Sequence, residues 1–168
     1  SDLAGTDYAI ASTDFSTTTI SEFGFFILPK SITKISLNNS SGETARLFDS
    51  QNNLVSEINY SEIAADDVAW ARDETGIWHW STTQTAGAEN IITAPATPSS
   101  GSSGGSSYVP PKYPSQIKIN EIFSNPIGPD SDEWIELKSF EGEMFSLADW
   151  QLKSELGTYI IKESDFKW

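Results

Sequence analysis

The sequence contains no cysteine among its 168 residues. A disulfide framework, a thiolate metal site and a cysteine nucleophile are therefore excluded, and packing alone must hold the core. The sequence also lacks an apolar run near the roughly 20 residues that a membrane-spanning helix requires. Its first residues, SDLAGTDY, have neither the basic region nor the apolar stretch of a signal peptide. We expect no insertion into a membrane, and we expect the chain to be a fragment of a longer protein.

Positive charge is scarce. Ten Lys and Arg residues stand against 24 Asp and Glu residues, which gives a formal net charge of -14 at pH 7. Such a surface repels phosphate backbones, so nucleic acid is not an expected partner. Acidic surfaces attract cations, basic partners and cationic polymers, but they suit many functions. The charge therefore argues against nucleic-acid binding but does not identify a function.

Apolar residues make up 38% of the chain and aromatic residues 12%, which is enough to bury a core. They occur in short runs that are separated by segments rich in Asn, Asp, Ser and Gly. Regularly spaced short strands with such turns predict an all-β sandwich, and no amphipathic helix is expected beyond single turns within 60–69 and 141–149. The expected strands are 24–28, 34–37, 44–48, 54–60, 68–72, 116–123, 134–138, 147–152 and 158–161.

Strand alternation predicts which side chains share a face. In the first strand of the C-terminal part, Ile117, Ile119 and Glu121 fall on one face. In the next strand, Glu136 lies opposite the face of its apolar neighbours. We therefore expect Glu136 to reach solvent or to pair with a lysine.

A segment rich in Ser, Gly, Pro and Thr occupies residues 93–114. Its Gly/Ser middle predicts flexibility, and its Pro-rich ends predict a stiffer, extended backbone. It is interpreted as a linker between residues 1–92 and 115–168. The string GSSGGSS is also what a designed linker looks like, whereas the flanking Pro and Thr are typical of a natural stalk, and both origins stay open.

Several spaced motifs of the C-terminal part resemble the opening of a lamin-tail domain, in the same order. These motifs are INEI at 119–122, Asn125-Pro126, EWIEL at 133–137 and LADWQL at 147–152. Asp149 stands where that family usually has Gly, which suits a left-handed backbone that Asp tolerates.

The N-terminal part resembles the later strands of the same domain. The matching segments are FFIL at 25–28, GETARL at 42–47, LVSEINY at 54–60 and the closing TAGAEN at 85–90. Gln84 and Ala86 stand where the family signature usually has prolines. The resemblance implies late strands within 1–92 and early strands within 115–168.

This order leaves three arrangements open. The chain holds half-domains cut from a tandem repeat, or residues 115–168 pack on 17–92 as one sandwich in permuted order, or the exposed strand edges exchange with a second copy. We favour completion within one molecule. The predicted fold class is all-β, an immunoglobulin-like antiparallel β-sandwich similar to the lamin-tail domain.

One loop carries oxygen ligands at close spacing, namely Asp130, Asp132 and Glu133. Carboxylate oxygens are the ligands that calcium prefers. The loop lacks the ordered ligand pattern of an EF-hand, and a solvated acidic turn is the structural alternative. Calcium is the one ligand ion that the sequence indicates, and no other cofactor is expected.

The six tryptophans are many for this length. Trp78 and Trp80 could present an aromatic face on which sugar rings stack, whereas packing in the core or at a sheet edge is the structural alternative. His79, between them, is the only histidine, and no nucleophile elbow accompanies it, so a structural role is expected.

Three glutamates could supply a carboxylate pair of the kind that glycosidases use: Glu121, Glu133 and Glu136. The lamin-tail motifs retain Glu121 and Glu133, and a buried carboxylate that accepts backbone N–H bonds is a structural reason for such residues. We expect no enzymatic activity.

The resemblance implies a non-catalytic structural or interaction module of an extracellular or cell-surface bacterial protein. The alternative is a carbohydrate- or calcium-dependent adhesion domain. The expected partner is a protein or a cell-surface glycan. A DNA-binding attachment of a secreted nuclease is a third class, and the charge of -14 opposes it.

Overall fold

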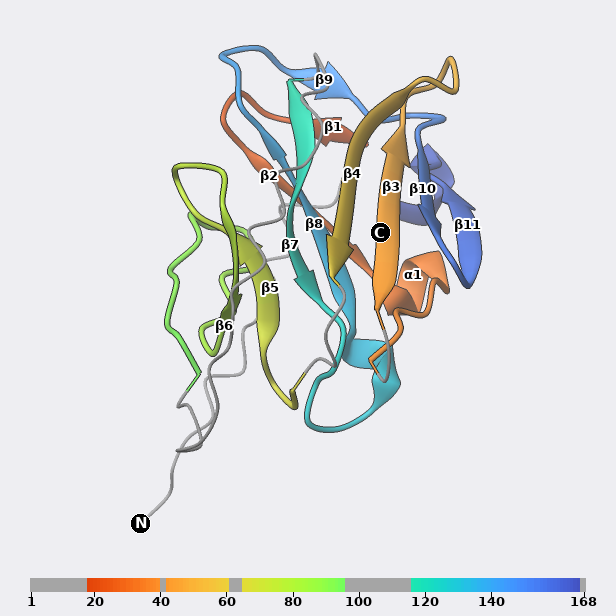
Figure 1. The fold of residues 1–168 in the computed structure, drawn as a ribbon. Coiled ribbons are helices and arrows are strands. Elements are labelled where there is room, and N and C mark those ends of the chain that lie inside the picture. The colour runs from red at the N-terminus through yellow and green to blue at the C-terminus, as the bar shows by residue number, and fades with distance from the viewer. Residues whose placement is uncertain (1–17, 40–41, 61–64, 96–115, 167–168) are drawn as a thin grey trace.

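The computed structural model describes residues 18–39, 42–60, 65–95 and 116–166. Their strands form two main antiparallel sheets that face each other, so the predicted all-β sandwich is confirmed (Figure 1). The larger sheet has the order β2-β8-β7-β5-β6, with the bounds Phe25–Pro29, Trp134–Ser139, Ile117–Phe123, Ala69–Arg72 and Trp78–Ser81. The smaller sheet has the order β11-β10-β3-β4, with the bounds Gly157–Ile160, Gln151–Ser154, Glu43–Phe48 and Leu54–Tyr60.

Short elements complete the described structure. Strands β1 (Thr19–Ile20) and β9 (Phe145–Ser146) pair as a separate two-stranded sheet. One helical turn, α1 (Lys30–Thr33), follows β2. Two short 3-10 helices, η1 (Asp130–Asp132) and η2 (Glu163–Phe166), precede β8 and follow β11.

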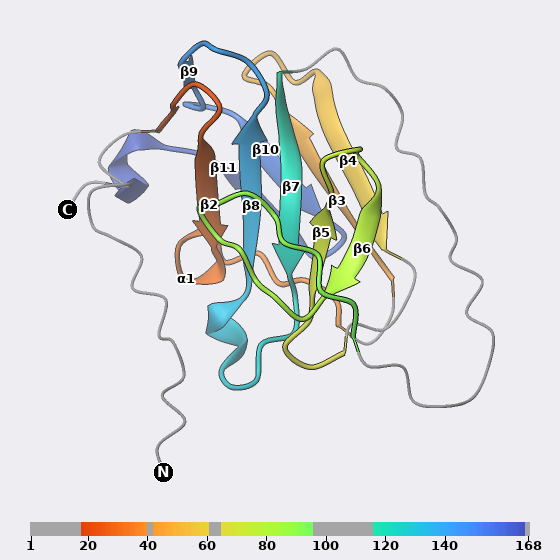
Figure 2. The same cartoon turned by 90° about the vertical axis from the view of Figure 1, so that its left-hand side faces the viewer.

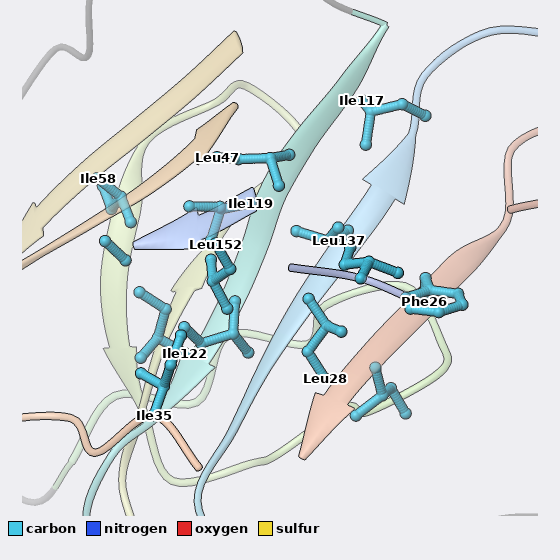
Figure 3. Close-up of a cluster of buried hydrophobic side chains, with 14 of the residues drawn as sticks. Phe26, Leu28, Ile35, Leu47, Ile58, Ile117, Ile119, Ile122, Leu137 and Leu152 are labelled. Carbon is cyan, nitrogen blue, oxygen red and sulfur yellow. The ribbon is translucent and has the colours of Figure 1, made fainter. Parts of the chain in front are cut away.

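The core lies between the two sheets (Figure 3). The larger sheet contributes Ile119, Ile122 and Leu137, and the smaller sheet contributes Leu47 and Ile58. All five side chains are almost completely buried. Because the full burial of one such side chain contributes roughly 1.5–3 kcal/mol, this layer supplies the main favourable free energy of folding.

Both sheets combine strands from the two sides of the predicted linker. In the larger sheet, β8 pairs with β2 and β7 pairs with β5. In the smaller sheet, β10 pairs with β3. The two central strands of the larger sheet therefore come from the C-terminal part, while their outer neighbours come from the N-terminal part (Figure 2).

These pairings predict a monomer that unfolds in one cooperative transition. Light scattering would give the mass in solution, and thermal unfolding followed by tryptophan fluorescence would give the transition. A dimer that separates only on unfolding would indicate exchanged strands. A broad or missing transition would indicate two half-domains that do not complete each other.

The strand predicted at 34–37 was wrong. Residues 34–37 form no regular element; the preceding residues 30–33 form α1, and Lys34 ends that turn with a φ of 57°, in the left-handed region. Ile35 and Leu37 still point into the core, with exposed fractions of 4% and 5%. The apolar pattern thus identified buried positions correctly but not their backbone conformation.

The strand predicted at 147–152 begins late, because residues 147–150 form a turn. Trp150 N donates to Leu147 O at 3.1 Å, and Asp149 has a φ of 64°. The left-handed backbone expected at Asp149 is confirmed. Strand β10 begins only after this turn, at Gln151.

The left-handed turn makes a stability prediction at Asp149. Asp149→Ala is expected to lower the free energy of unfolding by about 1 kcal/mol, because a Cβ without a local hydrogen-bonding group disfavours positive φ. Asp149→Gly is the matched control, and we expect it to be as stable as the parent or slightly more stable. Urea denaturation of the parent and the two variants measures the order of their stabilities. Equal losses of unfolding free energy in both variants would contradict the argument.

Most of the predicted linker, from residue 96 to 114, lies outside the described residues, as do residues 1–17. Its first residues are described. Thr93 O accepts a hydrogen bond from Thr82 N at 2.9 Å, which ties the start of the linker to the end of β6.

Candidate functional site

The segment that follows β6, residues 82–95, crosses the outer face of the larger sheet, opposite the smaller sheet (Figure 2). Its two ends are held together near β6, where Ser81 Oγ donates to Ile91 O at 3.0 Å. Its middle passes over β7 and β8, where Thr85 and Gly87 contact glutamates of these strands. We call residues 82–95 the crossing segment. It covers a sheet face that alternation alone assigns to solvent.

A β-bulge decides which side chains of β7 lie under the crossing segment. The register between β7 and β8 shifts after Ile119, so that Asn120 is the extra residue and Glu121 pairs with Glu136. The bulge reverses the alternation and leaves Ile122 in the core. The prediction that Glu121 shares a face with Ile119 was therefore wrong, and Glu121 lies on the outer face beside Glu136.

Both glutamates have an exposed fraction of 0%. The prediction that Glu136 reaches solvent or pairs with a lysine was wrong, because the crossing segment covers it. Glu136 Oε2 accepts a hydrogen bond from Gly87 N at 2.6 Å, and its Oε1 accepts one from Asn120 Nδ2 at 2.8 Å. Glu121 accepts bonds from Thr85 N, at 3.2 Å to each oxygen.

Burial raises the pKa of both glutamates, since an ionised carboxylate loses its hydration under the crossing segment. The pKa of Glu121 rises to about 7, although the bonds from Thr85 oppose the rise. The pKa of Glu136 rises to about 8, opposed by the bonds from Asn120 and Gly87 and increased by the nearby Glu121. Two carboxyl groups under one loop thus titrate near neutral pH.

The Thr85 hydroxyl lies within hydrogen-bonding distance of two acceptors. Thr85 Oγ1 is 2.8 Å from Glu121 Oε2 and 3.1 Å from Asn90 Oδ1. The Asn90 amide is fixed in orientation, because its Nδ2 lies 2.8 Å from Arg72 O and 3.0 Å from Asn120 O, which are both acceptors. One hydroxyl hydrogen shared between two acceptors forms a three-centre bond, which is weaker to each acceptor than a full bond. A protonated Glu121 that donates to Thr85, which in turn donates to Asn90, satisfies both contacts.

A cleft opens beside the crossing segment, on the same outer face. Its volume is about 540 Å³. Its lining combines apolar side chains of the sheet with polar side chains of the loops and of η1: Ile27, Pro29, Ser31, Asp67, Gln84, Ala86, Phe123, Ser131, Asp132 and Trp134. A cavity of this size matches the pockets that hold small ligands or single peptide side chains.

The aromatic side of the cleft is built by strand register. Trp134 begins β8 and lies between its cross-strand neighbours Pro29 and Phe123. The Phe123 and Trp134 rings have centroids 5.8 Å apart, tilted by 40°. All three side chains point away from the core because they alternate with core residues. Trp134 is half-buried, so part of its ring faces the cleft.

Asp67 stands at the polar side of the cleft with a fixed backbone. Its φ is 61°, in the left-handed region. Its N–H donates to Asn125 O at 2.8 Å, and its carbonyl accepts a bond from Gln84 Nε2 at 2.5 Å. A non-glycine residue held in this conformation by bonds on both sides often marks a functional position.

Two of the three residues predicted to bind calcium, Asp132 and Glu133, have described side chains, and these lie in different surroundings. Asp132 is exposed and lines the cleft. Glu133 is 2% exposed, and its two oxygens accept hydrogen bonds from Lys30 Nζ and Leu37 N, both at 2.9 Å. Asp130 begins η1. Within the described ranges, no group of three or more His, Asp or Glu side chains is arranged to hold a metal ion, and calcium binding stays a prediction.

Trp78 and Trp80 lie in an aromatic cluster with Trp70 of the neighbouring strand. The Trp70 ring stacks on Trp78 at 6.2 Å and lies 4.8 Å from Trp80. Trp78 is only 7% exposed. Trp78 and Trp80 thus pack against a neighbouring ring, as the structural alternative for these residues requires. Sugar stacking on them stays a prediction. His79 Nε2 lies 2.9 Å from Asp73 Oδ2, in the turn between β5 and β6.

No family model matches the chain, and no curated protein or solved structure does so either. The resemblance to the lamin-tail domain accordingly rests on the sequence motifs alone. In the described part of the chain, no helix is long and apolar enough to cross a membrane.

Sequence reasoning found Asp132 but missed the rest of the cleft. The cleft joins residues from four separate regions of the chain, which only the strand pairing brings together. One signal was present: Phe123 and Trp134 are large aromatic residues at strand positions that alternate away from the core.

Proposed function

We propose that this chain is a non-catalytic interaction module of an extracellular bacterial protein and that the cleft is its contact site. The observation that carries the proposal is the cleft itself, whose lining combines the aromatic residues Phe123 and Trp134 with the acidic residues Asp67 and Asp132. Binding sites combine apolar walls with a few polar groups in this way. The linker, rich in Ser, Thr and Pro, is typical of a surface stalk and supports a place outside the cell.

The non-catalytic part of the proposal is supported by the hydrogen bonding of the glutamates. Glu121, Glu133 and Glu136 are all buried, and each binds backbone N–H groups of the protein itself. A catalytic carboxylate must reach the substrate within hydrogen-bonding distance. These three side chains instead attach one segment of the chain to another.

The test uses the Trp134 indole N–H resonance as a reporter of the cleft. Trp134→Phe identifies that resonance, and Trp150→Phe serves as a control at a tryptophan outside the cleft lining. The protein, isotope-labelled for NMR, would be titrated with panels of basic, acidic and neutral peptides and with neutral oligosaccharides. We expect at least one panel to shift the Trp134 resonance in a saturable manner. If no panel shifts it at millimolar concentration, the cleft is not a contact site.

A carbohydrate-binding module is the second candidate. It is favoured by the neighbouring rings of Trp134 and Phe123, because apolar faces of sugar rings pack on aromatic side chains. In this case neutral oligosaccharides alone would shift Trp134. The indole resonances of Trp78 and Trp80 report on the site that the sequence indicated for sugars. The same spectra therefore compare sugar binding at that site with sugar binding in the cleft.

A further inference from the structure

We propose that the cleft binds a basic segment of a partner protein and that a lysine or arginine side chain of that segment enters the cleft between Trp134 and the carboxylates Asp67 and Asp132. This inference rests on the proposed function, because it names the class of partner for the same cleft. It excludes a neutral ligand as the main occupant.

The charges around the cleft favour a cation. Asp67 and Asp132 both line it, and the lining contains no lysine or arginine. The nearby Lys30 is already paired, since its Nζ lies 2.9 Å from Glu133 Oε1. Among the described residues, neither Asp67 nor Asp132 forms an ion pair. A positive side chain would therefore meet two carboxylates that lack a counter-charge.

The aromatic side of the cleft suits the same cation. An ammonium or guanidinium group is attracted to the face of an aromatic ring, most strongly to tryptophan. The protein makes such contacts within itself: Arg72 lies 4.7 Å from the centroid of Phe140, and Lys153 lies 4.0 Å from that of Phe48. Trp134 is half-buried and offers part of its ring to the cleft. A cation there would combine ring contact with carboxylate contact.

The backbones of the two cleft aspartates are held in place before any ligand binds. The Asp67 backbone is fixed by its bonds to Asn125 and Gln84. Asp132 ends η1, where Asp132 N donates to Pro129 O at 3.1 Å. Because these backbones are already held, binding of a ligand orders only the two aspartate side chains, which limits the loss of conformational freedom. Ser31 and Ser131 add hydroxyl groups for the backbone of a bound peptide.

The charge of the whole chain acts in the same direction. A net charge of -14 attracts basic partners over a distance and speeds their association. A neutral sugar gains nothing from this attraction. A basic segment uses both the long-range charge and the two carboxylates, so it fits the observations better than a glycan.

The test compares four probes on the full chain at low and moderate salt. The probes are a five-residue peptide with two lysines, the same peptide with two arginines, the same peptide with two glutamates, and a neutral tetrasaccharide. Binding would be followed by the Trp134 indole resonance and by calorimetry. We expect the two basic peptides to bind with saturation at Trp134, more weakly as salt rises, and we expect the other two probes to give no response.

Matched variants separate the effect of the cleft carboxylates on binding from the effect of the net charge of the chain. Asp67→Asn and Asp132→Asn each remove one charge from the cleft, and asparagine also tolerates the left-handed backbone at position 67. We expect each to weaken binding of the basic peptides about fivefold. Glu22→Gln and Glu74→Gln remove the same charge at exposed positions that do not line the cleft, and they should change affinity less than about twofold. Thermal unfolding would check that all four variants fold.

Three outcomes would overturn the inference. Equal weakening by the cleft and control variants would show general charge attraction. If the tetrasaccharide shifts the Trp134 resonance and the basic peptides do not, the cleft is a contact site but its partner is not a basic segment. No Trp134 response to any probe would contradict both the inference and the proposed function.

Discussion

Raising the pH from 5 to 9 is expected to destabilise the fold. Glu121 and Glu136 have pKa values raised to about 7 and about 8, above those of the unfolded chain. Below the unfolded pKa both states hold the protons, so the stability is fully present. As the pH rises, the unfolded chain releases these protons first, and stability is lost up to the folded pKa values. Between pH 5 and the folded values lie about 2 pKa units for Glu121 and about 3 for Glu136, and each unit corresponds to roughly 1.4 kcal/mol, so we expect a total loss on the order of 6 kcal/mol.

Urea denaturation at a series of pH values measures this loss. Glu121→Gln is the informative variant, because its amide can donate to Thr85 Oγ1 as a protonated Glu121 would. We expect this variant to be as stable as the parent near pH 5 and more stable than the parent near pH 9. His79→Asn, measured in parallel, removes the only histidine from the comparison. A stability that stays constant or rises from pH 5 to 9 would show that both glutamates are ionised in the folded protein at all these values.

The second large effect is expected at Asn90. Its amide donates to the carbonyls of Arg72 and Asn120 and accepts a bond from Asn120 Nδ2 at 3.1 Å. Asn90→Ala leaves these partly buried groups without their partner, and we expect the free energy of unfolding to fall by about 3 kcal/mol. Since the crossing segment also contributes Gln84 and Ala86 to the cleft, the variant should respond less at Trp134 to any cleft ligand.

A matched control for this variant is Asn39→Ala. The Asn39 amide also reaches across the fold, but it donates a hydrogen bond to Asn125 Oδ1, at 3.2 Å, away from the crossing segment. We expect a loss of about 1 kcal/mol in this control. Hydrogen exchange of the Gly87 amide adds a local measurement, because this amide should lose protection in the Asn90 variant alone. Similar losses in both variants would mean that Asn90 is not the main attachment of the crossing segment.

The sequence predicted the fold class and most strands because apolar alternation and turn residues are local signals. Strand β4 was predicted with the bounds that the structure has, Leu54–Tyr60. Strand β6 was not among the predicted strands. Its residues, WHWS, alternate between aromatic and polar side chains for only four positions, which is too short a run to identify a strand, and its place beside β5 depends on pairing such as that between Trp70 and Trp80.

The misassigned faces of Glu121 and Glu136 have two physical causes. For Glu121, the extra residue Asn120 reversed the alternation, and period-2 reasoning cannot find a bulge. For Glu136, the alternation was right but the outer face is covered. Which face of a sheet meets solvent depends on where a distant loop lies, and a single strand holds no such information. The expectation that Glu121 and Glu133 accept backbone N–H bonds was confirmed.

The candidate site was predictable only in part, for the same reason. Asp132 was singled out by its loop, but its neighbour Glu133 turns inward to Lys30 and Leu37. The remaining cleft residues have no shared motif, because tertiary packing alone makes them neighbours. Trp134 belongs to the family-like motif EWIEL, which indicated its strand but not that its half-buried ring lines a cleft.

The arrangement of the larger sheet has a consequence for how the chain folds after synthesis. Strands β7 and β8 stand in its middle, yet a ribosome makes them after β2, β5 and β6. Until they emerge, β2 has no neighbour in the sheet, because its residues pair with β8, as Phe25 does with Lys138. Pairings over such long separations are slow to form, so nearly the whole chain should leave the ribosome before the sandwich closes. Shortening the segment between the two parts would then change the folding rate more than the stability of the finished protein.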